Sequence, residues 1–172
     1  AYEEFSEHYP MTEDMIYDGR PPEANFSYGF AKRAMGVQIE ACNKQYSTQY
    51  NYVIPCNLFG RHDKYNEQRS HYVGALVKKI HDAKTSGKDH IILFGTGTPL
   101  RQFIYADDVA KVIKHFIDND ITENVNIASS EKTYTIHEIA EIALKACDAE
   151  HLKVVYDSTK PDGQFRKDVS NK

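Results

Sequence analysis

Cysteine is scarce in this sequence, long apolar runs are missing, and neither sign of charge dominates. The three cysteines, Cys42, Cys56 and Cys147, are an odd number, too few for the disulfide framework of a secreted domain and too widely spaced for a zinc knuckle. No window reaches the roughly 18 apolar residues that a membrane-spanning helix needs, and the acidic, polar start is not typical of a signal peptide. We therefore expect a soluble cytoplasmic protein with no metal and no membrane partner.

The charge balance argues against nucleic acid as a partner. Lysine and arginine number 21 against 25 aspartates and glutamates, for a net charge of −4, whereas nucleic-acid-binding modules usually carry a basic stripe. Roughly 70% of the surface of an extended chain of this size can be buried on folding. The 172 residues thus suffice for one large domain, or for one domain with a small addition.

Segments with helical apolar spacing alternate with short apolar segments along the chain. The expected strands are 52–59, 90–94, 102–105, 125–128 and 152–156, and the expected helices are 27–46, 71–86, 107–119 and 136–146. This alternation predicts an α/β fold with mainly parallel strand pairing. Residues 1–26, which proline and glycine interrupt, and the polar residues 160–172 are expected to be loops.

Helix ends and buried faces can be predicted in more detail. Ser27 is expected to cap the first helix and Asp107 the third, and Thr135 with Glu138 forms an S/T-x-x-E capping box for the last. Gly87 is expected to end the second helix. The expected buried stripes are Ala31, Ala34, Met35, Ile39, Cys42 and Tyr46 in the first helix, and Val109, Val112, Ile113, Phe116 and Ile117 in the third.

The glycine-rich turn that usually opens a nucleotide-binding α/β domain does not precede Ser27. The string GTGTPL at 95–100 has Leu100 where a third glycine or alanine should stand, and Pro99 and no helix follow the glycines. This departure favours a tight turn between strands over a dinucleotide-binding turn.

Tyr28 and Lys32, in the string SYGFAK, are four residues apart on the first predicted helix, so both leave the same face one turn apart. A free phenol titrates near 10. A neighbouring ammonium favours the phenolate and lowers the pKa, which would let Tyr28 exchange a proton during a reaction. Tyr-x-x-x-Lys also occurs by chance in helical proteins, so both interpretations stay open.

Three further places could carry chemistry. The string NLFGRHD at 57–63 follows a strand end, where parallel α/β folds bind ligands, and the loop after it leads to His71, a proton-transfer residue or a helix-capping surface histidine. Arg101 suits a bidentate grip on phosphate or a surface salt bridge. The string KPDG at 160–163, together with Arg166 and Lys167, is either a second anion-binding loop or a solvated tail.

Five strings in this order and spacing resemble the GDP-L-fucose synthase branch of the extended short-chain dehydrogenase/reductase family. They are SYGFAK, VIPCNLFGRHDKY, SHYVGALVKKIHDAK, ILFGTGTPLRQFIYADDVA and DSTKPDGQFRK. The resemblance implies an incomplete NAD(P)-binding Rossmann fold, of which only the later helices and strands are present, with a small substrate-binding domain. Residues 1–60 would end the Rossmann domain, and 61–172 would mainly form the substrate domain, with 107–119 and 125–128 returning to the first. The chain looks like a C-terminal fragment.

The same resemblance implies NADPH-dependent epimerisation and reduction of GDP-4-keto-6-deoxy-D-mannose by a homodimer. Tyr28 would be the acid of the reduction, Lys32 its electrostatic partner and a cofactor ligand, and His71 the acid of the epimerisation. A catalytic cysteine of the family has no counterpart in this chain. The implied cofactor-binding residues are Lys32, Pro55, Cys56, Asn57, Leu58 and His71, and the substrate-binding residues are Lys79, Phe94, Arg101 and Lys153, to which we add Asp162.

Two alternatives remain open. The chain could belong to another nucleotide-sugar epimerase, reductase or dehydratase of the same family, because Tyr-x-x-x-Lys does not specify the sugar. It could also be a non-catalytic GDP-sugar-binding fragment. Because no phosphate-binding glycine turn is found, we expect the chain alone to bind its substrate at most.

Overall fold

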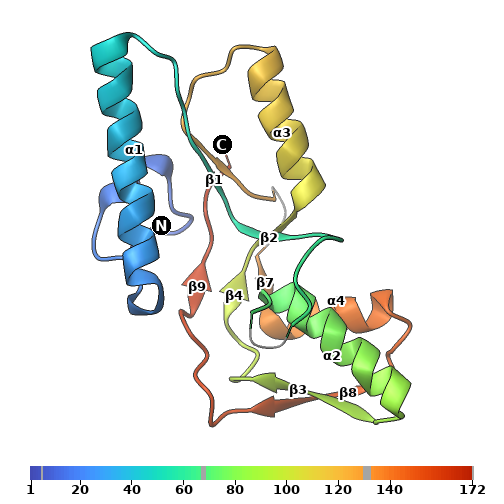
Figure 1. Ribbon diagram of the computed structural model, residues 1–172. Helices are drawn as coiled ribbons and strands as arrows, with labels where there is room; N and C mark the ends of the chain where they lie inside the picture. The colour runs from blue at the N-terminus through green and yellow to red at the C-terminus, as the bar shows by residue number, and fades with distance from the viewer. Residues whose placement is uncertain (5, 67–68, 130–132, 172) are drawn as a thin grey trace. The chain divides into compact units, whose positions relative to one another are not determined.

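The computed structural model describes residues 1–4, 6–66, 69–129 and 133–171. The chain divides into two compact units. Unit 1 consists of Ala1–Cys56, Asp107–Ser130 and Asp168–Lys172, and unit 2 consists of Asn57–Ala106 and Glu131–Lys167. The chain thus passes between the units four times (Figure 1). The expected domain limit at residue 60 stays a prediction.

Unit 1 contains a long helix and a small parallel sheet. Its elements are two 3₁₀ helices at Glu13–Tyr17 and Glu23–Asn25, α1 at Phe26–Tyr46, β1 at Val53–Pro55, α3 at Ala106–Asp118, whose first residue belongs to unit 2, and β6 at Val125–Ile127. Strands β1 and β6 pair in parallel, with Val53 opposite Val125. The residues before α1, expected to be loop, therefore include two short 3₁₀ helices.

Helix α1 buries a different face from the one that its apolar spacing predicts. Gly29, Arg33 and Gly36 are buried, whereas Met35 is 52% exposed. A Cβ at Gly29 would lie only 2.5 Å from the Cβ of Pro21, so the absence of a side chain lets the N-terminal segment approach the helix closely. The N-cap position is held by Asn25 without a side-chain hydrogen bond, so the prediction that Ser27 caps this helix was wrong.

Arg33 attaches the N-terminal segment to α1. Arg33 as a whole residue is 7% exposed. Its guanidinium donates to the backbone oxygens of Ala1, Gly19 and Asp18 at 3.0, 2.7 and 2.7 Å. Burial lowers the pKa of this guanidinium, and the negative charge of Asp18 opposes that effect. A buried charge with several carbonyl partners explains why a polar residue lies on the packed face of the helix.

The core of unit 1 lies between the N-terminal segment and β6. Its buried members are Tyr2, Met11, Ile16, Ala128 and Val169. Two polar contacts accompany them: the Tyr2 hydroxyl donates to Asn126 Oδ1 at 2.5 Å, and Met11 forms an isolated parallel bridge with Val169. Residues 168–170, which belong to the polar segment expected to be loop, are buried.

Helix α3 also departs from expectation. It begins at Ala106, directly after β5 ends at Tyr105, so Asp107 lies in its first turn and is not its cap. The strand runs straight into the helix, so Tyr105, the last residue of β5, directly precedes the first helical residue. Within the predicted stripe Val109 is buried, but Ile117 is 72% exposed, so only the start of the stripe is buried.

Unit 2 contains two helices on one face of a parallel strand pair (Figure 1). Its elements are β2 at Asn57–Phe59, α2 at Tyr72–Ser86, β3 at His90–Phe94, β4 at Leu100–Arg101, β5 at Phe103–Tyr105, β7 at Tyr134–Thr135, α4 at Ile136–Ala146, β8 at Lys153–Asp157 and β9 at Arg166–Lys167. Strands pair in parallel as β2–β5, β3–β8 and β4–β9, and β4–β7 is antiparallel. Mainly parallel pairing is thus confirmed, and the expected strand 52–59 is two strands divided at Cys56.

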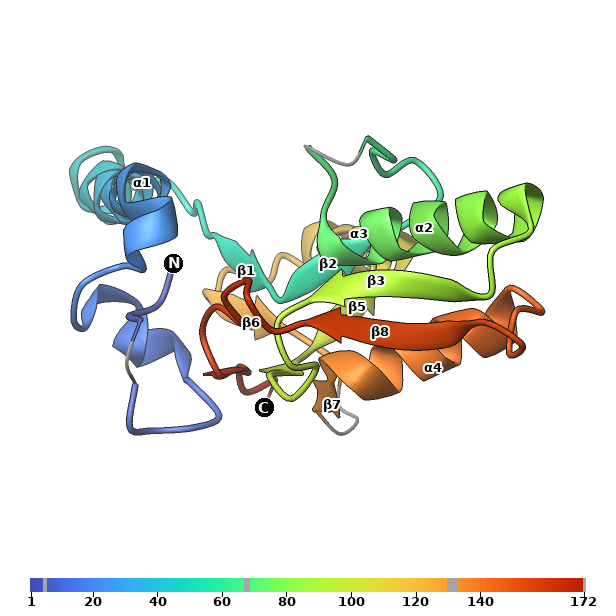
Figure 2. The same cartoon turned by 90° about the horizontal axis from the view of Figure 1, so that it is seen from below.

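Helices α2 and α4 cover the β3–β8 pair and form the core of unit 2 with it. Figure 2 shows α2 lying along β3 and α4 along β8. The buried residues are Leu76, Ile80, Ala83, Ile91, Leu93, Ala140, Leu144, Ala149 and Leu152. The predicted capping box of Thr135 and Glu138 is confirmed, as is Gly87 in the left-handed conformation at the end of α2 (φ 68°).

Candidate functional site

Tyr28 and Lys32 lie on the exposed surface of α1 in unit 1. Tyr28 is in the first turn of the helix and is 61% exposed. The Lys32 Nζ atom lies 5.7 Å from the centroid of the Tyr28 ring, as expected for residues one helical turn apart. The pair is therefore open to a ligand, with an ammonium beside a phenol.

The expected cofactor-lining segment follows the carboxyl end of β1. Pro55 ends that strand, and the Cys56 N–H donates to Ile127 O at 2.9 Å within unit 1. In unit 2, Asn57 begins β2 and its Nδ2 donates to Gln102 O at 2.8 Å, while Leu58 is exposed. The end of a parallel strand is where α/β sheets bind ligands.

His71 occupies the N-cap position of α2. Its backbone is extended (φ −72°, ψ 165°), and its side chain makes no capping hydrogen bond. The side chain is exposed, so the imidazole is not engaged in capping the start of the helix. His71 belongs to unit 2, whereas Tyr28 and Lys32 belong to unit 1.

The outer face of the β3–β8 pair carries several of the expected substrate-binding residues. Phe94 is 63% exposed. Lys153 lies on the same face of the strand pair, because it is opposite His90, and His90 and Phe94 are an even number of residues apart along β3. Lys79 of α2 donates from Nζ to Ile92 O at 2.6 Å and lies 4.9 Å from the centroid of the Phe94 ring. Aromatic and cationic groups thus meet on an exposed strand face. This arrangement is suited to binding a nucleobase or an anionic group of a ligand.

Arg101 of β4 contacts the segment that follows β8, and Asp162 is part of that segment. Arg101 Nη1 donates to Leu100 O at 2.7 Å and to Phe165 O at 3.4 Å. Asp162 Oδ1 accepts from the Thr96 N–H at 2.6 Å, and Oδ2 accepts from Thr96 Oγ1 at 2.9 Å. Asp162 is therefore anchored to the turn after β3, while residues 160–163 are exposed, so both interpretations of KPDG stay predictions.

The glycine-containing turn at 95–98 joins two strands, as its sequence predicts. Gly95 and Gly97 adopt positive φ angles of 81° and 79°, and β4 follows without an intervening helix. Among the described residues, no glycine-rich turn joins a strand to a helix, and no group of three or more His, Cys, Asp or Glu residues could hold a metal ion. None of the described helices is both long and apolar enough to cross a membrane.

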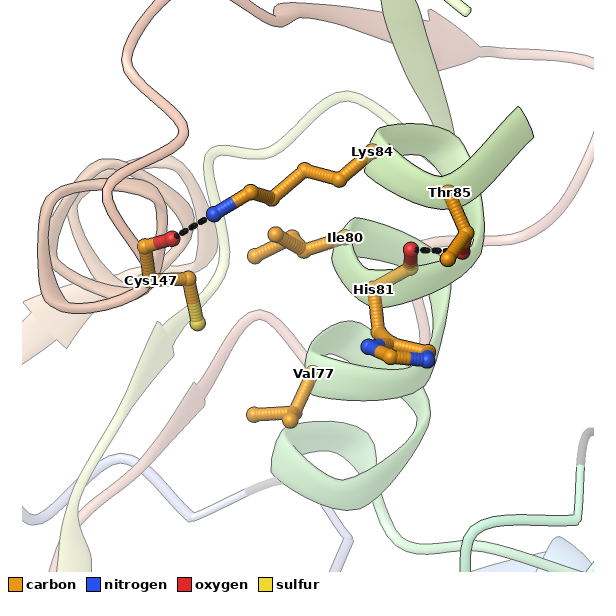
Figure 3. A pocket seen from close by; sticks show the side chains of 6 residues that line it. All are labelled: Val77, Ile80, His81, Lys84, Thr85 and Cys147. Atoms are coloured by element: carbon orange, nitrogen blue, oxygen red, sulfur yellow. Dashed lines mark hydrogen bonds between the residues drawn. The ribbon is translucent and has the colours of Figure 1, made fainter. Parts of the chain in front are cut away.

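A surface cavity of about 380 Å³ is lined by none of the expected site residues (Figure 3). It is lined by Val77, Ile80, His81, Lys84, Thr85 and Cys147. Lys84 Nζ donates to the backbone oxygen of Cys147 at 2.5 Å and so links the end of α2 to the end of α4. The aromatic and cationic side chains Phe94, Lys79 and Lys153 lie instead at the exposed face of the β3–β8 pair.

Sequence reasoning missed a polar cluster next to the turn at 95–98. Tyr156 Oη lies 2.9 Å from His137 Nδ1, and His137 Nε2 lies 3.3 Å from Glu141. Burial raises the pKa of Tyr156, and the negative charge of Glu141 raises it further. The i,i+4 spacing of His137 and Glu141 is visible in the sequence, but Tyr156 reaches them only through the fold.

The protein class follows from the sequence family. The chain belongs to the NAD dependent epimerase/dehydratase family, whose model matches residues 1–128. The α/β architecture with parallel strand pairs agrees with this class.

Individual relatives carry more specific names than the family does. The chain is 36% identical over 171 residues to a probable GDP-L-fucose synthase of Drosophila melanogaster, covering 95% of this chain and 53% of the relative. It is 37% identical to a GDP-L-colitose synthase of Yersinia pseudotuberculosis, covering 94% and 53%. A crystal structure of a GDP-L-fucose synthetase from Naegleria fowleri bound to NADP matches with a TM-score of 0.89 and 30% identity, covering 99% of this chain and 54% of that one. The motif-based resemblance to GDP-L-fucose synthases is confirmed, and the chain spans about half the length of these relatives.

Proposed function

We propose that this chain provides the substrate-binding and proton-transfer residues of an NADPH-dependent GDP-L-fucose synthase. The observation that supports this most is the identity of 31–37% to curated relatives, including several named GDP-L-fucose synthases, over more than nine-tenths of the chain. The activity is proposed for a full-length protein with a cofactor-binding half, because the chain spans about half of each relative. A homodimer in the cytoplasm is part of the proposal.

The substrate would be GDP-4-keto-6-deoxy-D-mannose, held on unit 2. Arg101 supplies a guanidinium for the diphosphate, since a planar fork suits two phosphate oxygens. Phe94, with Lys79 beside its ring, offers an apolar face and a positive charge to the nucleotide. Lys153 lies on the same face and adds a second positive charge.

Epimerisation moves protons at the two carbons that flank the ketone. The ketone acidifies these C–H bonds, a base removes the proton from one face, and His71 would return a proton to the other. The exposed imidazole at the start of α2 is suited to this role, because histidine is the side chain that most often transfers protons in general acid–base catalysis. The base is expected to come from a residue outside this chain.

Reduction requires a proton for the former ketone oxygen. NADPH supplies the hydride when bound, and the residues that would hold it here are Lys32 and Pro55–Leu58, which lie on an exposed helix face and at the end of a parallel strand. Tyr28 would give its hydroxyl proton to the alkoxide, and Lys32 would stabilise the phenolate that remains.

The test is product analysis with the full-length enzyme, GDP-4-keto-6-deoxy-D-mannose and NADPH. Stoichiometric NADPH oxidation with formation of GDP-L-fucose is expected. Binding of the sugar nucleotide without that product would favour a second candidate, another GDP-sugar enzyme of the family. The 37% identity to a GDP-L-colitose synthase supports this second candidate. For the 172-residue chain alone we expect GDP binding without turnover.

A further inference from the structure

Tyr72, the first residue of α2, directly follows His71 and is tied to the other long helix of unit 2. Its hydroxyl donates to Ile136 O, at the start of α4, at 3.0 Å. Burial raises the pKa of this phenol above its ordinary value, and the nearby Tyr156 raises it further. The hydroxyl therefore keeps its proton and stays the donor. The two helices are thus joined by a hydrogen bond one residue away from the proposed acid of the epimerisation.

The ring of Tyr72 is held in place as well as its hydroxyl. It packs against the buried core of unit 2, and its centroid lies 5.9 Å from that of Phe103 in β5, with the two ring planes at 33°. Aromatic pairs at such separations attract each other beyond the effect of the area that they bury. The side chain is therefore fixed by contacts with α4, with β5 and with the core.

The carbonyl that accepts this hydrogen bond belongs to a firmly supported helix start. The Ile136 N–H donates to Pro99 O at 3.0 Å, and the His137 N–H donates to Gly97 O at 2.9 Å. These bonds satisfy two N–H groups that have no partner inside the helix, and the capping box adds a further support. The start of α4 is thus attached to the turn after β3, and it can serve as an anchor for α2.

His71 itself is held through its backbone. The Ala75 N–H donates to His71 O at 3.0 Å, whereas the imidazole is exposed and makes no capping hydrogen bond. Consecutive side chains leave the backbone in different directions, so an inward Tyr72 leaves His71 on the outer surface. The place of the imidazole therefore depends on how the first turn of α2 is fixed.

We infer that Tyr72 is a positioning residue for His71: its hydroxyl fastens the first turn of α2 to the start of α4 and so fixes the point from which the imidazole reaches the sugar. This role rests on the proposed function, which makes His71 the acid of the epimerisation. Tyr72 acts on the reaction only through the neighbouring residue, because its own hydroxyl is turned to Ile136.

An NMR experiment on the 172-residue chain without ligand tests the structural part. Tyr72→Phe keeps the ring against Phe103 and removes only the hydrogen bond, so the fold should persist. Amide hydrogen exchange of Ala75 should rise about fivefold, the effect of losing one neutral hydrogen bond, and the ring resonances of His71 should shift. Unchanged Ala75 exchange with unmoved His71 resonances would refute the inference, whatever the enzyme assays show.

The matched control is Tyr105→Phe. Tyr105 is also a partly buried tyrosine of unit 2, and its ring packs against that of Phe59 with the centroids 5.5 Å apart. Within the part of the chain that the structure describes, its hydroxyl has no hydrogen-bond partner. The substitution should change neither the Ala75 exchange nor the His71 resonances. Equal effects of the two substitutions would contradict a specific role of the Tyr72 hydroxyl.

In the full-length enzyme, deuterium exchange next to the ketone tests the functional part. Tyr72→Phe should slow this exchange about fivefold, while GDP affinity stays within about twofold, because the proposed nucleotide contacts do not involve Tyr72. In a His71→Ala background, Tyr72→Phe should have no further effect, since residues that act as one unit are not additive. An equal further loss in that background, or a matching fall in GDP affinity, would show a general structural defect and overturn the inference.

The positioning role and the proposed function can fail separately. Normal deuterium exchange in His71→Ala would remove the proton-transfer role of His71 from the proposed function. The NMR changes in Tyr72→Phe would still support the placement of His71 by Tyr72, because they need neither substrate nor turnover.

Discussion

At the scale of single residues, the proposed chemistry depends on three exposed side chains. Tyr28 and Lys32 are one helical turn apart on α1 with the ammonium 5.7 Å from the ring centroid, and His71 lies at the start of α2 without a capping role. Exposure is the property that they share, and a proton donor must reach its substrate. Each can therefore be removed without opening a core.

Tyr28→Phe should lower the rate of NADPH oxidation by the full-length enzyme about 100-fold, a usual effect of losing a general acid. Substrate affinity should change little, because the ring remains. Steady-state assays of NADPH absorbance measure both. Tyr46→Phe is the matched control, since Tyr46 is an exposed tyrosine at the far end of the same helix; equal rates for the two variants would contradict the role of Tyr28.

His71→Ala should lower the exchange of deuterium into the carbons next to the ketone by about 100-fold, because the acid that returns the proton is lost. Mass spectrometry of sugar nucleotide incubated in D₂O measures this exchange. His81→Ala, on the same helix, should leave the exchange unchanged. Normal exchange in His71→Ala would assign the acid elsewhere.

At the scale of secondary-structure elements, α1 shows how one buried polar residue determines which face packs. Arg33 gives its donors to three backbone oxygens of the N-terminal segment, and the flanking glycines allow the close approach. The apolar side chains around Met35 are left on the other side of the helix. Propensity and spacing predicted the helix correctly, but the packed face was decided by residues outside it.

Arg33→Lys should loosen the N-terminal segment, because an ammonium cannot present the guanidinium's fork to three carbonyls. Loss of one such bond costs about 2 kcal/mol, or roughly a 30-fold rise in amide exchange through local opening. The Glu4 N–H, which donates to Arg20 O at 3.1 Å, is the reporter in an NMR exchange experiment. Arg20→Lys is the control, because Arg20 forms only an exposed i,i+3 ion pair with Glu23 through the charged group that lysine keeps. It should change the amide exchange of Glu4 little. Unchanged Glu4 exchange in Arg33→Lys would contradict the anchoring role.

At the scale of the whole molecule, each unit leaves apolar side chains on its surface. Unit 1 exposes Met35 and Val37 on α1 and Ile113 and Ile117 on α3, and unit 2 exposes Ile92, Phe94 and Val155 on one strand face. Exposed apolar residues that gather on one element favour association. In unit 2 the same exposure is proposed to serve nucleotide binding.

The 172-residue chain is expected to self-associate through α1. Light scattering at rising concentration should show species larger than the monomer. Replacing Met35 and Val37 together by lysine should shift the chain toward monomer, since two charges would have to be buried in the contact. Ile142→Lys, at an exposed isoleucine of α4 in unit 2, is the control and should leave association unchanged. A monomer at all concentrations before substitution would exclude this contact.

The sequence by itself determined the features that depend on near neighbours in the chain. Helix spacing, the capping box of Thr135 and Glu138, the left-handed Gly87 and the turn at 95–98 are all local, and the α/β class and family followed from their order. The strings around Tyr28, His71 and Arg101 also led to the proposed site, which stays a prediction.

Only the tertiary structure decided which distant segments meet. It divided the expected strand 52–59 at Cys56, because β1 pairs with residues 125–127 and β2 with residues 103–105. It turned Arg33 inward and placed the carboxylate of Asp162 on Thr96, 66 residues away in the chain. Such contacts depend on which backbone and side-chain groups lie opposite one another after folding, and periodicity along the chain carries no information about those partners.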